Sequence, residues 1–235
     1  MEGLRTTAIP ARESAMLNEI LAGNIPSFLS ADLCEVQVEA DGHQGTFYVA
    51  PDYLAVGTNE DFVRTPLNPL SAQKIADAFG CVLPTAKMTD LIWKAADAKL
   101  PPAPWGPPYD DSMLSTDRII VHNDRVQAQF SATGKPLGTL IAGIKKDVVL
   151  TNLLKSPPDH VAIYGWHKLN GEPIQGPPPN AVSHEITYAD YSHGIRLVFG
   201  TMIVDGQPMP TAAVMAHASL CVLLSNEGPI KHPSY

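Results

Sequence analysis

The stretch ITYADYSHGIRLVFGTMIV, residues 186–204, decides the fold class of this chain. Apolar, β-branched and aromatic residues dominate it, which is typical of a β-strand, and Asp205-Gly206 directly after it predicts a turn. The runs 137–154 and 160–169 have the same strand-like composition. We therefore expect an α+β protein with a mainly antiparallel sheet in the C-terminal half, packed with several helices.

The helices are predicted from apolar residues that recur every three or four positions and from the residues that start and stop them. Ser71 is the expected cap of the second helix, and Pro84-Thr85 are expected to open the third. The predicted helices cover 12–22, 72–79, 86–100, 113–132 and 210–224.

The segment PPAPWGPPYDDS, residues 101–112, is a stiff Pro-rich connector and the best candidate for a boundary. It separates residues 1–100, which combine helices with a β-meander over 33–56, from the sheet-bearing region 113–235. A length of 235 residues also allows one single domain.

Composition limits the class of partner. The net charge is −8 and no basic run occurs, which disfavours binding to nucleic acid or to an anionic membrane surface. No run of about 18 apolar residues predicts a membrane span. The N-terminus lacks a signal-peptide pattern, so we expect a cytoplasmic protein, or an extracytoplasmic one if a leader precedes Met1. The oligomeric state stays open.

Cys34, Cys81 and Cys221 are odd in number and form no C-x-x-C pair. We therefore expect three free thiols, with neither a disulfide framework nor a zinc ribbon. No motif in the chain predicts a cofactor.

A candidate active site follows from the alternation of side chains along strands. In a continuous strand over 186–199, Asp190, Ser192 and Arg196 share one face, and His193 lies on the other among apolar residues. The strand 160–169 likewise carries an apolar face that ends at His167. We expect the two histidines to meet at one sheet rim, beneath the long Pro-rich connection 170–184.

These residues suggest a hydrolase-type enzyme that acts on an amide or ester of a carboxylate-bearing small molecule or polymer. His167 and His193 are the expected acid and base, and Ser192 is the candidate nucleophile. Arg196 is the expected clamp for a substrate carboxylate, because its planar fork suits two oxygens. The remaining candidates are Tyr191 as a further catalytic group and Trp166, Tyr188 and Asp190 as substrate-binding residues.

Residues 160–199 contain a local resemblance to a known family. Ser192-His193-Gly194 followed by Ile195-Arg196, downstream of His167, resembles the signature of L,D-transpeptidases. That family has a nucleophilic cysteine between the positions of Gly194 and Ile195, where this chain has no residue. The resemblance implies a groove for cell-wall peptide but not cysteine chemistry.

A wider resemblance joins the segments YVAPDYL, LPTAKM, YGWH and YADYSHGIRLV. Together they are similar to an uncharacterised group of bacterial proteins. This implies that the segments belong to one fold, and it implies no activity.

Several alternatives remain open. The polar residues of 186–199 could belong to a solvated sheet face, or to a non-catalytic binding module with a degenerate enzyme-like groove. A lyase is a further alternative, with Tyr188 or Tyr191 as the acid and Arg196 holding a carboxylate. His122-Asn123 is expected to pack or cap locally. Lys145-Lys146-Asp147 is expected to form a solvated strand end, and the alternative places one Lys in the cleft beside Asp147.

A metal site is another alternative, although its candidate ligands match no compact spacing such as H-E-x-x-H. These ligands are His167, His184, Glu185, Asp190 and His193.

Overall fold

The computed structural model describes residues 1–177 and 182–235. It confirms an α+β protein in which most strands pair antiparallel. The α-helices are α1 (Ile9–Leu21), α2 (Phe28–Ala31), α3 (Pro69–Ala78), α4 (Ala86–Ala95), α5 (Thr116–Ala132) and α6 (Thr211–Ala216), and short 3-10 helices are η1 (Glu2–Leu4), η2 (Asp111–Leu114) and η3 (Leu220–Leu223).

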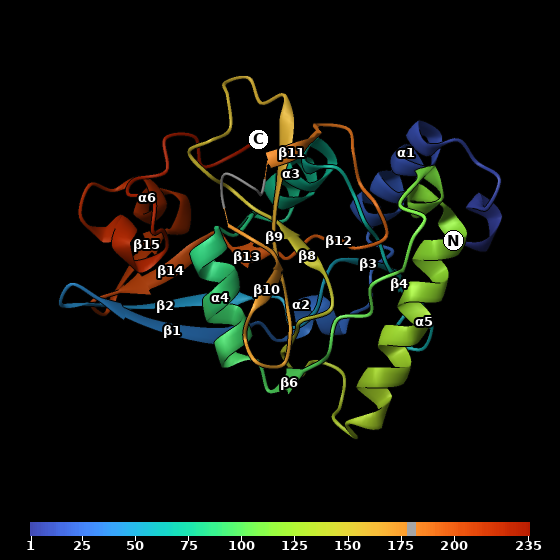
Figure 1. Cartoon of the computed structure of the whole chain (residues 1–235). Helices are drawn as coiled ribbons and strands as arrows, with labels where there is room; N and C mark the ends of the chain where they lie inside the picture. Colours follow the sequence, from blue (N-terminus) through green and yellow to red (C-terminus); the bar gives the residue numbers. More distant parts are fainter. Residues whose placement is uncertain (178–181) are drawn as a thin grey trace.

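The larger sheet joins both halves of the chain. It consists of β1 (Cys34–Ala40), β2 (His43–Val49), β5 (Cys81–Val82), β13 (Val198–Phe199), β14 (Thr201–Val204) and β15 (Gln207–Pro210). β1 and β2 form the predicted hairpin, and β2 also pairs with β13 and β14. Figure 1 shows this hairpin at the left with α6 beside it, at the opposite end of the molecule from α1 and α5.

The second sheet carries the residues expected to be functional. It consists of β8 (Lys146–Val148), β9 (His160–His167), β10 (Pro173–Gln175), β11 (Val182–Glu185) and β12 (His193–Gly194). β8 lies between β9 and β12, and its pairing with β12 is parallel. Two small pairs complete the strands: β3 (Ala55–Gly57) with β4 (Phe62–Arg64), and β6 (Ala98–Lys99) with β7 (Ile141–Ala142).

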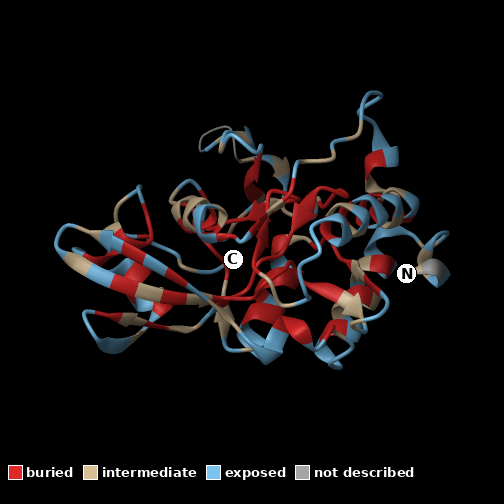
Figure 2. Ribbon diagram, turned by 90° about the horizontal axis from the view of Figure 1, so that it is seen from below, coloured by how far each residue is buried: buried red, intermediate tan, exposed pale blue. Residues whose placement is uncertain are grey.

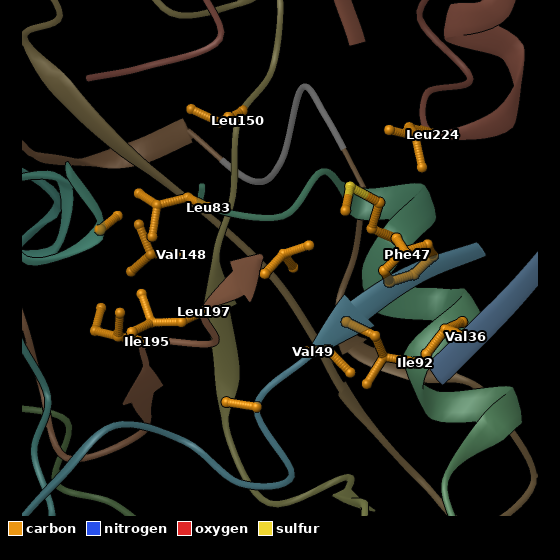
Figure 3. Close-up of a cluster of buried hydrophobic side chains, with 14 of the residues drawn as sticks. Val36, Phe47, Val49, Leu83, Ile92, Val148, Leu150, Ile195, Leu197 and Leu224 are labelled. Atoms are coloured by element: carbon orange, nitrogen blue, oxygen red, sulfur yellow. The ribbon is translucent and has the colours of Figure 1, made fainter. Parts of the chain in front are cut away.

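The largest apolar cluster lies between the two sheets and the helices. Val49 of β2, Ile92 of α4, Val148 of β8 and Leu197 belong to the same buried cluster. Figure 3 shows these side chains converging from separate parts of the chain, and Figure 2 shows the buried residues concentrated at the centre. The connector 101–112 therefore does not divide two separate cores, because strands from both sides of it share a sheet and a cluster.

The prediction of one continuous strand over 186–204 is wrong. Residues 186–192 form a turn and irregular backbone, and the rest is divided into β12, β13 and β14. The alternation argument for Asp190, Ser192 and Arg196 therefore fails, because two faces exist only where the backbone is regularly extended.

Three helix predictions also need correction. Asn68, not Ser71, caps α3, since its side chain accepts a hydrogen bond from Ser71 N. The helix predicted over 86–100 ends at Ala95, and the chain then forms the short strand β6. The segment 210–224 contains the short α6 and the 3-10 helix η3 instead of one long helix.

Within the two described ranges, no helix combines the length and the apolar character needed to cross a membrane.

A candidate functional cleft beside Asp190 and Ser192

A cleft of about 480 Å³ lies where the connector meets the second sheet. Its walls come from three parts of the chain: the segment 104–114, strands β8 to β11, and the irregular backbone before β12. The lining residues used below are Trp105, Tyr109, Asp110, Asp111, Lys146, Trp166, Ile174, Gln175, His184, Tyr188, Asp190, Tyr191 and Ser192. Five residues predicted from the sequence therefore line one cleft: Trp166, Tyr188, Asp190, Tyr191 and Ser192.

Trp166 reaches the cleft because β9 is distorted there. Gly165 has φ 99° and Trp166 has φ 55°, both in the left-handed region that L side chains rarely adopt. The regular alternation of β9 is broken at this point, so Trp166 lines this cleft whereas Tyr164 lines another cavity. Lys146 of β8 places its Nζ 5.4 Å from the centre of the Trp166 ring.

Asp190 organises one wall of the cleft. Its carboxylate accepts hydrogen bonds from Ser192 N at 2.7 Å, Ser192 Oγ at 2.6 Å and Tyr188 Oη at 3.1 Å. Burial alone would raise the Asp190 pKa, but the charge that His193 carries when protonated, the charge of Lys146 and the two hydrogen bonds from Ser192 lower that pKa to about 2. Asp190 is thus ionised at neutral pH and holds the Ser192 hydroxyl in place.

His193 lies behind this wall and is fully buried. Its ring centre is 5.5 Å from that of Tyr188 and 6.5 Å from that of His184. Burial lowers the pKa of His193 to about 4, despite the nearby charge of Asp190, so the imidazole is neutral at neutral pH. Among the described residues, neither of its nitrogens has a hydrogen-bond partner, and Ser192 is therefore not bonded to an imidazole.

His167 does not line the cleft. Its Nε2 lies 2.8 Å from Asp90 Oδ1, which also accepts a hydrogen bond from Tyr164 at 2.9 Å. Its ring stacks on that of Trp93. Asp90 and Tyr164 line a different cavity of about 440 Å³. The rings of His167 and His193 thus contact different side chains and do not share the expected rim.

Arg196 is fully buried and is not among the residues that line the cleft. Its two terminal nitrogens donate to Ala50 O at 3.0 Å and to Ile141 O at 2.8 Å, and its guanidinium lies 4.0 Å from the centre of the Tyr53 ring. These contacts tie three segments of backbone together. We therefore assign Arg196 a structural role and not the role of a carboxylate clamp.

The connection 170–184 was expected to cover a cleft shared by His167 and His193, and it does not do so among the described residues. Ile174, Gln175 and His184, all from the connection 170–184, line the cleft. Residues 178–181 of this connection lie outside the described residues.

Sequence reasoning missed a set of buried charged groups behind the cleft. Lys145 and Asp147 are buried, although this strand end was expected to be solvated. The Tyr53 hydroxyl donates to Asp147 Oδ2 at 2.9 Å, and Lys145 Nζ donates to the backbone oxygen of Tyr191. Burial lowers the Lys145 pKa to about 7 and raises the Asp147 pKa to about 6.

Gly194 permits this arrangement. A Cβ at Gly194 would lie 2.4 Å from Tyr53 Cδ1 and 2.6 Å from Lys145 Cβ, so only glycine fits between them. Alternation in KKDVVL could not have signalled this burial, because Lys146 shares the other face with apolar Val148 and Leu150.

The His122-Asn123 pair on α5 is buried as well. Asn123 Oδ1 accepts hydrogen bonds from the backbone and side chain of Arg64, whose guanidinium is paired with Asp52 at 2.5 Å. The His122 ring lies 5.1 Å from that of Tyr191. This pair therefore packs against the back of the cleft wall.

No group of three or more His, Cys, Asp or Glu side chains that could hold a metal ion occurs in residues 1–177 and 182–235. Comparison with protein-family models, curated proteins and solved structures gives no significant match to this chain.

Proposed function

We propose that the protein is a hydrolase-type enzyme that cleaves an amide or ester in the cleft beside Asp190 and Ser192. The observation that carries this proposal is Ser192, a buried residue that lines the cleft and whose hydroxyl donates at 2.6 Å to a buried, ionised carboxylate. A hydroxyl oriented in this way is a candidate nucleophile for acyl transfer.

The roles follow from the groups at the wall. Ser192 Oγ attacks the carbonyl carbon and its proton moves to Asp190, while Lys146 supplies positive charge for the oxygen anion that forms. The proton then passes to the leaving amine or alcohol as its bond to the carbonyl carbon breaks, and water releases the acyl group from Ser192. Because the pKa of Asp190 is low, Asp190 holds this proton only transiently, and in the resting protein it orients the Ser192 hydroxyl.

A second candidate function is a non-catalytic binding module. It is favoured by the absence of an imidazole bonded to Ser192, since both nitrogens of His193 lack partners among the residues described. The lyase with Arg196 as carboxylate clamp is disfavoured, because that side chain is fully buried on two backbone carbonyls.

The resemblance to the L,D-transpeptidase signature suggests a cell-wall peptide or other polymer as substrate, and it does not carry over that family's acyl-enzyme chemistry. It does not supply the cysteine: among the described lining residues of the cleft there is none.

Labelling with a serine-reactive fluorophosphonate tests the proposal. We expect one adduct, on Ser192, that is lost in Ser192→Ala and reduced in Asp190→Asn. Ser183→Ala is the matched control, because Ser183 is exposed and lies outside this cleft. An unlabelled Ser192 in folded protein that still binds ligands would favour the binding module instead.

A further inference from the structure

His184, on strand β11, is the only histidine among the described residues that line the cleft. The register of the pairing between β11 and β9 shifts between Val182 and His184. A shift of this kind redirects side chains and is common beside active sites. The direction of His184 is therefore not the one that regular strand alternation would predict.

The His184 ring lies beside the groups that orient Ser192. It stacks on the ring of Tyr188, with the ring centres 4.0 Å apart and the ring planes at 11°. The Tyr188 hydroxyl donates to Asp190, whose other oxygen accepts the hydrogen bond from Ser192 Oγ. The centre of the His184 ring is also 6.5 Å from that of His193, the residue that follows Ser192. An imidazole is thus held next to the candidate nucleophile without a direct bond to it.

The ring nitrogens of His184 are available for proton transfer. Within residues 1–177 and 182–235, its contacts are with aromatic rings, and neither nitrogen has a hydrogen-bond partner. Its partial burial lowers its pKa, while the charge of Asp190 raises that pKa and the charge of Lys146 lowers it. A neutral imidazole can accept a proton at neutral pH and return it in the next step.

Water can approach His184 from a second side. A neighbouring cavity of about 740 Å³ shares Leu114, His184 and Tyr188 with the cleft. Because His184 lines both spaces, a water molecule can contact its ring while an acyl group occupies the cleft.

The other titratable side chains of the described lining are less suited to this task. They are three tyrosines, Lys146 and the carboxylates of Asp110, Asp111 and Asp190. Ordinary tyrosine and lysine side chains keep their protons at neutral pH, and ordinary carboxylates are weak bases. Asp190 also accepts three hydrogen bonds already.

We infer that His184 is the general base of the second step, in which water releases the acyl group from Ser192. The imidazole takes one proton from the water as the water oxygen bonds to the acyl carbon. It returns this proton to Ser192 Oγ as the bond between Oγ and the acyl carbon breaks, which leaves a carboxylic acid and the free serine. This inference rests on the proposed function, and it deepens it by naming the group that makes water the acyl acceptor.

The test separates the two steps with p-nitrophenyl acetate, whose coloured leaving group departs in the first step. The variant His184→Phe keeps a ring that can stack on Tyr188 but has no nitrogen to accept a proton. His232→Phe is the matched control, because His232 is exposed and lies outside the cleft.

We expect His184→Phe to release one equivalent of p-nitrophenol as fast as the wild type and then to turn over about a hundredfold more slowly. Mass spectrometry should find an acetyl group that accumulates on Ser192 in this variant and in neither the wild type nor His232→Phe. Added imidazole should restore part of the turnover of His184→Gly and should have no such effect on Ser192→Ala.

Turnover of His184→Phe equal to that of His232→Phe overturns the inference, because the ring and not its nitrogens would then matter. Loss of the first burst together with turnover, in a variant that melts like the wild type, also overturns it. His184→Gln is measured in the same way, so that the result does not depend on the folding of one variant. A failure of the proposed hydrolysis is seen separately, as wild-type protein that gives neither a burst nor an acetylated Ser192.

Discussion

Three cationic side chains, Arg64, Lys145 and Arg196, are fully buried, and each is stabilised in a different way. Arg64 is paired with Asp52, so its charge is balanced by a neighbouring carboxylate. Arg196 donates to two backbone oxygens and lies on an aromatic ring. Lys145 has a pKa lowered to about 7 by burial, so its positive charge is partly lost at neutral pH. A buried charge is costly unless it is paired, hydrogen-bonded or neutralised.

We predict that Arg196→Lys lowers the free energy of unfolding by about 2–3 kcal/mol, because an ammonium cannot donate to both Ala50 O and Ile141 O from one planar fork. Urea denaturation and the melting temperature measure the loss. Activity per folded molecule should not change. Lys155→Ala is the control, because its side chain is 71% exposed and the melting temperature should stay the same. An Arg196→Lys protein that keeps its stability but loses turnover would instead support the role of Arg196 as a carboxylate clamp.

His193 makes stability depend on pH. Burial lowers its pKa in the folded protein to about 4, below the ordinary value of 6.5, so protonation favours the unfolded chain. The neutral imidazole therefore makes its full contribution to the free energy of unfolding above pH 6.5. This contribution is lost as the pH falls towards 4. The groups facing the ring include Asp190, Lys146 and His184.

We therefore expect wild-type protein to lose stability relative to His193→Asn as the pH falls from 6.5 to 4, by at most about 1.4 kcal/mol per pH unit. Urea denaturation of both proteins at several pH values gives the difference. Asp147, whose pKa is raised to about 6, changes stability in the opposite sense but is present in both proteins. A difference that does not vary with pH would show that the His193 pKa is not lowered.

At the scale of elements, short strands with interruptions position the cleft. β9 is regular up to Tyr164 and is then distorted by the positive φ values of Gly165 and Trp166, which allows Trp166 to line the cleft. The segment before β12 leaves the sheet, and in it Ser192 donates to Asp190 only two residues away. A regular strand could not make this contact, because residues two apart are separated by about 6.6 Å.

Helix α4 depends on one side chain at its start. Thr85 Oγ1 accepts a hydrogen bond from Met88 N at 3.2 Å and also donates to the backbone oxygen of Leu224. We predict that Thr85→Ala lowers the free energy of unfolding by about 1–2 kcal/mol, whereas Thr85→Ser, which keeps the hydroxyl, loses much less. Chemical denaturation measures both variants. Equal losses would mean that the methyl group, and not the cap, is responsible.

At the scale of the whole molecule, the two sides of the Pro-rich connector depend on each other. β2 and β5 lie before it and pair with β13 after it, and β6 pairs with β7 across it. The main apolar cluster contains residues from Met16 to Ile230. Cys34, Cys81 and Cys221 are all free, as the sequence predicted, so no disulfide links the halves.

We predict that residues 1–100 and 113–235, produced separately, are each largely unfolded, because each lacks strands and core residues supplied by the other. Circular dichroism and amide hydrogen exchange measure this. A fragment that unfolds cooperatively on its own would show that the connector separates two domains after all.

Local patterns in the sequence predicted the elements whose structure is itself local. The hairpin of β1 and β2, strand β9 and helix α5 follow from side-chain periodicity and turn residues, and they were found close to their predicted limits. The segment 186–204 was predicted wrongly because its composition favours a strand, whereas tertiary contacts divide it. The sequence also identified Trp166, Tyr188, Asp190, Tyr191 and Ser192, which line one cleft.

The sequence by itself thus determined the α+β class, the free thiols and the residues around Asp190, since these depend on composition and near neighbours. The tertiary structure alone decided that Arg196 is structural, that His167 contacts Asp90, and that Asp110 and Asp111 line the same cleft as Asp190. Arg196 donates to Ala50 O, 146 positions away in the sequence. The burial and charge environment of a side chain depend on which distant backbone packs against it, and no local pattern contains that information.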